Sequence, residues 1–300
     1  MGQTIPIVWV NAFTRQAFGG NPAVVVPDAE GLEQDMMQNI AREVNCSETA
    51  FILTSRHPEA DLKIRWFTPS QEVKLCGHAT VAALHALCEA GRFNLLPGSL
   101  QILYLDTLSG VLPVTIDFTH QDAAWIWLTV PAASLTPLSD EQLKHIGSAL
   151  SCSQPYGTSK GPRVIEGVVD SLNRDVLLKL ESLDQLQTLS PHYTELAALG
   201  EKEQWRGFCT FTTETIDPDN TAHVRFFAPQ AGIDEDPVTG SVSAPLGQYL
   251  KQSDKSLGDV LRVEQGNSLG RPGRVHVSLQ DPSPKIGGQA ITLLTGAFQL

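Results

Sequence analysis

The feature that most constrains the fold of this chain is a motif that occurs twice. RWFTPSQEVKLCGHATVAAL runs from Arg65 to Leu84, and RFFAPQAGIDEDPVTGSVSAPL runs from Arg225 to Leu246. Each copy has an Arg, two aromatic residues, a small residue and Pro, then a polar loop, a Gly beside a polar residue and a run of small and apolar residues. This pattern predicts a strand, a loop and a buried helix in each half of the chain. We therefore expect two similar domains with a cleft between them, into which both helix N-termini could face.

Residue spacing predicts the other elements of each half. We expect helices over 32–44, 78–91, 139–150 and 237–252, of which the second has almost no polar face and ends at Gly91. Strands flank these helices, for example over 61–67 and 222–227, and the strand 291–298 closes the chain. The polar turn FTHQDAA, residues 118–124, is the expected domain boundary.

Composition limits the classes of partner. The chain has 300 residues, with 33 acidic and 21 basic side chains and a formal net charge of −12. That balance disfavours nucleic acid and anionic membranes, which need a basic surface. We see neither a signal-peptide pattern nor an apolar run as long as a membrane span. The five cysteines contain no C-x-x-C pair. We therefore expect reduced thiols in a cytoplasmic protein.

Two polar residues of the first half are candidates for proton transfer. Glu48 precedes the apolar residues Ala50 and Phe51, so partial desolvation could suit its carboxylate to acid–base work, although it could also be a solvated turn residue. His78 follows a Gly at the start of the buried helix, where its imidazole could transfer a proton, bind substrate or simply bond to backbone. His85 lies inside the apolar helix, and we interpret it as a core histidine.

The second half offers different polar residues near its helix start. Asp236 precedes Pro237, and Asp followed by Pro is common at the start of a helix, with Asp as the N-cap. Asp236 could therefore cap the helix or have a chemical role. Gly240 and Ser241 could hold an anion with a bare amide and a hydroxyl. Cys76, back in the first copy, could be a thiolate acid or base beside His78, or a buried structural cysteine.

The sequence resembles the PhzF-like family of phenazine-biosynthesis proteins over essentially its whole length. The resemblance is carried by four motifs in order: VNAFTRQAFGGNPAVVV at 10–26, NCSETAFI at 45–52, RWFTPSQEVKLCGHATVAA at 65–83 and GIDEDPVTGSVSAPLG at 232–247. In such proteins the last motif commonly continues with Ala and then His or Asn, whereas this chain has GSVSAPL. That departure alters the small-residue wall expected beside a substrate and leaves the substrate open.

The resemblance implies an α+β chain of the diaminopimelate-epimerase-like fold. Two pseudo-symmetric domains would each wrap a curved sheet around a central helix, with the active site between them. The domains would be residues 1–120, completed by the strand 289–300, and residues 121–288. The resemblance further implies a homodimer that acts on a small carboxylate without a metal or organic cofactor.

The resemblance also assigns roles to individual residues. The general acid/base of the SETAF motif falls on Glu48, and the family's catalytic His and Asp fall on His78 and Asp236. Backbone amides at Gly77 and Gly240 would hold the substrate carboxylate. Ser241 and, from the first motif, Asn21 would complete the substrate-binding residues.

Three functions stay open at this point. Related epimerases use two cysteines, and Cys76 matches one of these positions while Thr239 occupies the other. The resemblance therefore favours a cofactor-independent isomerase in which Glu48 alone shuttles the proton. The alternatives are a racemase or epimerase that uses Cys76, and a non-catalytic protein that binds small anions on the same scaffold.

Overall fold

The chain folds into two compact units, which we describe separately. A computed structural model describes residues 4–92, 98–119, 123–150 and 164–300. Unit 1 comprises Met1–Thr129 with Lys285–Leu300, and unit 2 comprises Val130–Pro284. The expected boundary between residues 120 and 121 lies outside the described residues. Unit 1 continues through strand β8 (Trp125–Thr129), because β8 pairs with β7 (Gly110–Asp117) and β17 (Lys285–Gly288) of the same unit.

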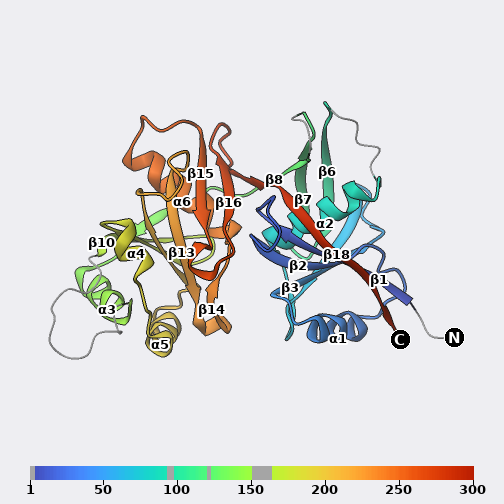
Figure 1. Cartoon of the computed structure of the whole chain (residues 1–300), viewed down its shortest axis with the longest axis horizontal. Coiled ribbons are helices and arrows are strands. Elements are labelled where there is room, and N and C mark those ends of the chain that lie inside the picture. Colours follow the sequence, from blue (N-terminus) through green and yellow to red (C-terminus); the bar gives the residue numbers. More distant parts are fainter. Residues whose placement is uncertain (1–3, 93–97, 120–122, 151–163) are drawn as a thin grey trace. The chain divides into compact units, whose positions relative to one another are not determined.

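Unit 1 is a curved sheet with one enclosed helix and one outer helix. Its remaining elements are β1 (Thr4–Ala12), β2 (Asn21–Val26), α1 (Gln34–Val44), β3 (Glu48–Leu53), β4 (Leu62–Phe67), β5 (Glu72–Val73), α2 (Gly77–Glu89), β6 (Leu100–Thr107) and β18 (Ala290–Gln299). Helix α2 packs against β1, β2, β3, β8 and β18, and every residue from His78 to Leu87 is buried (Figure 1). A helix without a polar face is stable only when the sheet surrounds it in this way.

The two ends of the chain lie side by side in unit 1. Strand β18 runs antiparallel to β1 from the pair Thr4–Gln299 to the pair Ala12–Ala290 (Figure 1). Pairing on this scale places the C-terminal strand in the sheet of the first unit. The returning segment begins at Lys285, since β17 pairs with β8, and is therefore longer than the strand 289–300 expected from the sequence.

Unit 2 contains its own set of paired strands, four α-helices and two 3-10 helices among its described residues. Its elements are β9 (Leu135–Pro137), α3 (Asp140–Leu150), β10 (Val164–Asp170), β11 (Asp175–Leu180), α4 (Leu183–Gln187), α5 (Tyr193–Glu203), β12 (Gly207–Thr212), β13 (Ala222–Ala228), η1 (Pro229–Ala231), β14 (Ile233–Asp236), α6 (Gly240–Ser253), β15 (Val260–Gln265), η2 (Asn267–Leu269) and β16 (Gly273–Ser278). The sequence patterns led us to expect α3 and α6 but not α4 and α5. Helix α5 buries only Leu196 and Gly200, so its apolar periodicity is weak.

The two units repeat one strand-pairing pattern. In unit 1, β2 and β3 are parallel, β3 and β4 antiparallel, β4 and β6 parallel, and β6 and β7 antiparallel. In unit 2, the same relations hold for β11 and β12, β12 and β13, β13 and β15, and β15 and β16. The enclosed helix follows the equivalent short strand each time, β5 before α2 and β14 before α6. The predicted fold class, a duplicated α+β chain, is confirmed.

The presence of Arg in both copies of the repeated motif has a structural cause. Arg65 on β4 binds both carboxylate oxygens of Glu72 at 2.7 Å, and its guanidinium lies 5.1 Å from the centre of the Phe67 ring. Arg225 on β13 binds Glu235 at 2.9 and 2.8 Å and lies 5.1 Å from the centre of the Phe227 ring. Each Arg thus ties the motif's strand to the short segment that precedes the enclosed helix.

The start of α6 differs from the expected one. The Asp236–Pro237 pair does not begin the helix, because Asp236 is still paired in β14 with Phe226, and the helix begins at Gly240. Pro245 lies inside α6 and has no N–H for the carbonyl of Ser241, four residues earlier. Asn173 compensates in part, since its Nδ2 lies 3.4 Å from that carbonyl oxygen.

A buried carboxylate makes the stability of unit 2 depend on pH. Glu264 on β15 is 0% exposed and accepts hydrogen bonds from the Ile216 amide, Asn220 Nδ2 and His223 Nδ1 at 2.6, 2.6 and 2.7 Å. Burial raises the pKa of this carboxyl, but hydrogen bonds from His223, Ile216 and Asn220 outweigh burial and lower the pKa from 4.5 to about 2.

We expect Glu264→Gln to weaken the loss of stability in acid. Because the folded pKa lies below the ordinary 4.5, the carboxylate stabilises the fold fully above that pH, and the contribution disappears as pH falls toward about 2. Urea midpoints measured between about pH 5 and pH 3 should therefore fall steeply for the natural chain and less for the variant. Parallel pH profiles of the two chains would contradict this role.

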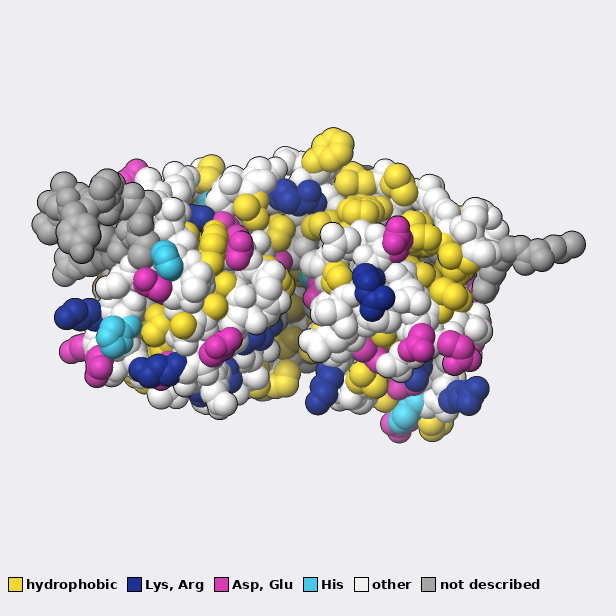
Figure 2. All heavy atoms as spheres, turned by 90° about the horizontal axis from the view of Figure 1, so that it is seen from below, with side chains coloured by type: hydrophobic (Ala, Val, Ile, Leu, Met, Phe, Trp, Pro, Cys, Tyr) yellow, Lys and Arg dark blue, Asp and Glu magenta, His cyan; other side chains and the backbone are white. Residues whose placement is uncertain are grey.

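The surface carries charges of both signs. Figure 2 shows acidic and basic side chains scattered over the face that it draws, in a chain with 33 acidic and 21 basic residues. Charges interspersed in this way differ from the continuous basic strip that a nucleic acid requires. Within the described part of the chain, no helix is long and apolar enough to cross a membrane.

Candidate functional site

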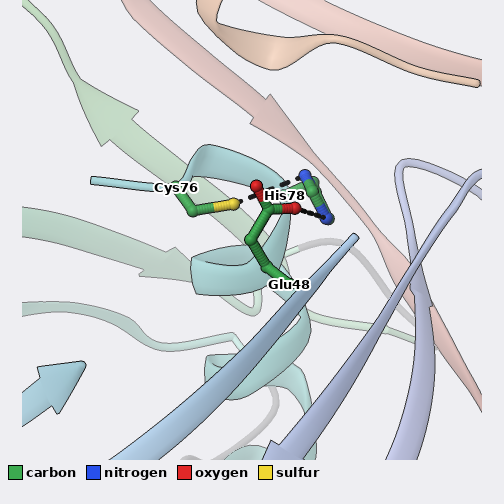
Figure 3. A group of neighbouring side chains, drawn as sticks. All are labelled: Glu48, Cys76 and His78. Carbon is green, nitrogen blue, oxygen red and sulfur yellow. Dashed lines mark hydrogen bonds and ion pairs between the residues drawn. The ribbon is translucent and has the colours of Figure 1, made fainter. Parts of the chain in front are cut away.

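Three reactive side chains meet at the N-terminus of α2 in unit 1 (Figure 3). Glu48 is the first residue of β3, Cys76 is the residue before α2, and His78 is the second residue of α2. Glu48 Oε2 lies 3.3 Å from His78 Nε2, and Cys76 Sγ lies 3.5 Å from His78 Nδ1. The imidazole therefore stands between a carboxylate and a thiol, and can pass a proton between its two sides.

These groups are shielded from water but not sealed from it. The side chains of His78 and Glu48 are 10% and 16% exposed, and Cys76 as a residue is 7% exposed. In the tautomer with its proton on Nε2, His78 donates toward Glu48 and accepts from the Cys76 thiol on Nδ1. A carboxylate held by one donor in a poorly solvated site is well suited to take a proton from carbon.

The backbone around the cluster fixes its geometry. Strand β3 runs parallel to β2, with Glu48 paired to Ala23. Glu48 therefore lies at the end of the sheet where both strands begin. The Thr80 hydroxyl donates to the carbonyl of Cys76 at 2.6 Å, which secures the first turn of α2. The first amides of an α-helix have no acceptor within the helix, so the amides of Gly77, His78 and Ala79 can bind an anion, whereas that of Thr80 already donates to the carbonyl of Cys76.

Asn21, a predicted substrate-binding residue, is the first residue of β2 and is completely buried. The hydroxyl of Ser47 donates a hydrogen bond to the carbonyl oxygen of the neighbouring residue Pro22 at 3.3 Å. The same hydroxyl lies 3.3 Å from Nε2 of His78. Asn21 is thus linked to the cluster through the adjoining backbone, while Ser47 touches it directly.

Unit 2 builds a different set of contacts at the start of α6. Ser241 Oγ accepts a hydrogen bond from Arg206 Nη2 at 2.9 Å, and Arg206 also forms a paired salt bridge with the buried Asp175. The hydroxyl of Thr239 donates to the carboxylate of Asp236. The predicted binding residue Ser241 is therefore already oriented by a guanidinium, and Asp236 acts on Thr239 rather than as a helix cap.

A glutamine completes this arrangement. Gln265 Oε1 accepts from the amide of Thr239 at 2.9 Å, and Gln265 Nε2 donates to the carbonyl of Asp236 at 2.8 Å. Gln265 Nε2 also lies 3.1 Å from Thr239 Oγ1. A side chain that is 1% exposed and bonded three times holds the loop before α6 in one conformation.

Sequence reasoning missed Ser47 and Arg206, although they occupy equivalent positions. Each residue immediately precedes the first residue of a strand, Ser47 before β3 and Arg206 before β12. Each also contacts the residue that follows the helix-start glycine, His78 in unit 1 and Ser241 in unit 2. Aligning the two halves beyond the repeated motif would have found them. Asp175 and Gln265 have no comparable signal, because they reach their partners only through the folded sheet.

The duplication is chemically asymmetric at the position of Glu48. Its counterpart at the start of β12 is Gly207. A Cβ on Gly207 would lie 2.3 Å from Cζ of Phe226, so the aromatic ring fills the space that a side chain would need. Thr239 likewise replaces the thiol of Cys76. Unit 2 therefore cannot place a carboxylate at this position without moving the Phe226 ring.

Comparison with known proteins gives a consistent result. A family model described as "Phenazine biosynthesis-like protein" (PhzC-PhzF) matches residues 10–296. An uncharacterized isomerase of Clostridium acetobutylicum is 34% identical, with 97% of each chain covered. A crystal structure of a PhzF-family phenazine biosynthesis protein from Bacillus anthracis matches with a TM-score of 0.83 and 29% identity, covering 99% of this chain and 100% of that chain.

More distant structures share the fold alone. A hydroxyproline epimerase from Agrobacterium vitis matches with a TM-score of 0.58 at 14% identity, covering 99% of this chain and 93% of that chain. The duplicated architecture therefore extends beyond the phenazine biosynthesis-like proteins to epimerases whose sequences have diverged almost completely.

Proposed function

Because the chain belongs to the phenazine biosynthesis-like (PhzC-PhzF) family and is an isomerase, we propose that it moves a proton within a small carboxylate substrate, with Glu48 as the acid–base group. The observation that carries this proposal is the contact between Glu48 Oε2 and His78 Nε2 at 3.3 Å, in a site where the Glu48 side chain is 16% exposed. A carboxylate so placed is accessible to a small ligand and only weakly hydrated.

The proposed step conserves atoms and charge without a cofactor. Glu48 removes a proton from a carbon of the substrate, and the electron pair of that C–H bond moves into the adjoining π system. The double bond shifts, and the protonated Glu48, whose proton can exchange with solvent while it is on the carboxyl group, returns a proton to another carbon on the same face. His78, which donates to Glu48 in the Nε2 tautomer, holds the carboxylate during both transfers. The outcome is an allylic isomerisation.

The asymmetry of the duplication supports a single shuttle. A stereoinverting racemase uses an acid and a base on opposite faces of its substrate. In unit 2 the position equivalent to Glu48 is Gly207, blocked by Phe226, and the position equivalent to Cys76 is Thr239. One complete acid–base group therefore argues for proton return on the same face.

The remaining assignments of the resemblance belong to this proposal. We propose that Asp236 contributes to the chemistry, and that the amides of Gly77 and Gly240, with Ser241 and Asn21, bind the substrate. The helix-start positions of Gly77 and Gly240 support anion binding by backbone amides. The homodimer, the cytoplasmic location and the independence from cofactors stay predictions.

Hydrogen exchange at carbon tests the proposed function. The chain is incubated in D₂O with dihydro-hydroxyanthranilate, the best-known substrate of the family that the sequence resembles, and with a panel of small cyclic and amino carboxylates. Carbon-bound protons are then followed by NMR. We expect deuterium to enter one compound as its double bond shifts. Ligand binding without exchange in any compound that binds would contradict the proposal and favour a non-catalytic anion-binding protein.

Cys76→Ser separates the shuttle from a Cys76-dependent racemase, the second candidate. The candidate has one observation in its favour, the 3.5 Å contact between Cys76 Sγ and His78 Nδ1. If Glu48 carries the proton, the variant should exchange substrate deuterium within about 10-fold of the natural rate, since the hydroxyl replaces only an outer hydrogen bond. A loss of roughly 10⁴-fold, measured by the same NMR assay, would instead assign the proton transfer to the thiol.

A further inference from the structure

The cluster at the start of α2 has a donor set that its proposed chemistry does not need. A proton shuttle requires Glu48 and His78, but the structure adds the thiol of Cys76. One ligand atom from each of Glu48, Cys76 and His78 can be chosen so that all lie within 4.8 Å of one another. Sulfur, imidazole nitrogen and carboxylate oxygen are the donors that zinc prefers in proteins.

We propose that Glu48, Cys76 and His78 bind a thiophilic divalent ion of the Zn²⁺ class, and that this ion switches the isomerase off. Metal binding stands on the geometry of the cluster alone, whereas inhibition rests on the proposed function of Glu48. An ion held by Glu48 and His78 occupies the carboxylate that takes the substrate proton. The site would therefore couple activity to the availability of free metal.

The distances suit a tetrahedral ion. Bond lengths of about 2.3 Å to sulfur and 2.0–2.1 Å to nitrogen put the two donors about 3.6 Å apart around one zinc. Cys76 Sγ and His78 Nδ1 are already 3.5 Å apart. Glu48 reaches the same ion by a change of side-chain rotamer, since its carboxylate now faces the other ring nitrogen, Nε2, at 3.3 Å (Figure 3).

The surroundings supply an outer partner for the ligating histidine. If Nδ1 takes the metal, Nε2 keeps its contact with the hydroxyl of Ser47 at 3.3 Å, which fixes the ring orientation. The hydroxyl in turn donates to the carbonyl of Pro22 at 3.3 Å. Three protein ligands leave a fourth position on the ion for water or for the carboxylate of a bound molecule.

Cobalt spectroscopy tests metal binding independently of activity. Co²⁺ is added to the reduced, metal-free full chain, and the thiolate-to-cobalt charge-transfer absorption in the near ultraviolet is recorded. We expect a band that saturates at one equivalent and disappears when Zn²⁺ is added, since zinc competes for the same donors. Cys76→Ser should abolish the band and His78→Gln should weaken it.

Cys88→Ser is the matched control. Cys88 lies on the same helix, but burial raises the pKa of its thiol to about 12, which disfavours the thiolate that a metal needs. The band should be unchanged in this variant. No band in the natural chain, or an equal band in Cys76→Ser chains that unfold at the natural midpoint, would overturn the site.

Inhibition is measured with the deuterium-exchange assay, each variant relative to its own metal-free rate. Zn²⁺ should remove exchange by the natural chain, and a chelator should restore it. Half-inhibition of Cys76→Ser should need at least about 10-fold more Zn²⁺, because even the loss of an outer-shell partner costs 10–100-fold in affinity. Stimulation by Zn²⁺ would overturn the inhibitory role. A chain that binds Co²⁺ but exchanges no substrate would refute the proposed function and leave the metal site standing.

Discussion

Replacing Glu48 by Gln is expected to lower the turnover of the isomerase by roughly 10⁴-fold or more while substrate binding stays within a few-fold. The amide has nearly the same shape as the carboxylate and can still face His78, which lies 3.3 Å from Glu48 in the natural chain. It cannot accept a proton from carbon at neutral pH. The step that the proposed mechanism assigns to Glu48 therefore loses its base.

Glu89→Gln provides a control within the same helix. Glu89 forms the other Glu–His pair of α2, with Oε1 at 3.3 Å from Nε2 of His85. Its carboxylate is 52% exposed, and burial is the main cause that lowers the pKa of His85. Loss of this pair removes a contact of the same length and chemistry at the opposite end of α2. Turnover should stay within about threefold of the natural rate.

The measurement combines single-turnover kinetics with deuterium exchange at carbon. A Glu48→Gln variant that binds substrate, unfolds at the natural midpoint and exchanges no deuterium would agree with the single shuttle. Exchange at more than a tenth of the natural rate would refute it. Equal losses in the Glu48 and Glu89 variants would point instead to a general disturbance of α2.

The duplication could be predicted from the sequence because its signal is local. The Arg and the two aromatic residues lie next to one another on one strand, and the small-residue helix follows within the same 20-odd residues in both copies. The enclosed helix could also be predicted from the sequence, since the run HATVAALHAL has almost no polar face and is therefore expected to be buried on all sides. The start of α6 could be predicted only approximately. Asp236–Pro237 follows the rule for a helix start, but Asp236 pairs in β14 and the helix begins at Gly240.

The contacts of the site depend on long-range pairing and could not be predicted in this way. Glu48 and His78 are 30 residues apart, and only the resemblance linked them; the parallel pairing of β2 and β3 then sets where Glu48 starts. The pairing of Arg206 with Asp175 needs β11 and β12 to lie side by side. The spacing of apolar residues does not predict such a pair, since both partners are polar residues at or just before the start of a strand.

The repeated Arg–Glu pairs predict the largest effect on stability. Arg225→Met is expected to lower the free energy of unfolding by about 3–5 kcal/mol, because it leaves the Glu235 carboxylate buried without its cation. Arg225 and Glu235 side chains are only 8% and 7% exposed. Arg225 Nη1 also donates to the carbonyls of Leu186 and Leu189 at 3.1 and 2.8 Å, and both acceptors lose this donor.

Arg65→Met is the matched variant in the other copy of the motif. Arg65 and Glu72 are 17% and 13% exposed. Besides Glu72, Arg65 contacts the side chains of Gln34 at 2.9 Å and Met37 at 3.7 Å rather than two backbone carbonyls. Water can reach the orphaned Glu72 more easily, so the loss should be smaller, on the order of 1–2 kcal/mol. The two substitutions remove the same kind of Arg–Glu pair beside a Phe ring, and they differ in the burial of the pair and in the two backbone carbonyls that Arg225 alone binds.

Urea unfolding measured together with amide hydrogen exchange separates the two effects, since the two Arg residues lie in different units. Exchange should accelerate in β13 and its neighbours for Arg225→Met, and in β4 and its neighbours for Arg65→Met. Adding Glu235→Gln to Arg225→Met should recover part of the loss, because the unpaired charge is then gone. Equal losses for the two Arg variants would mean that the bidentate pair itself, and not its burial, sets the stability of the motif, and the repeated Arg would then be explained by geometry alone.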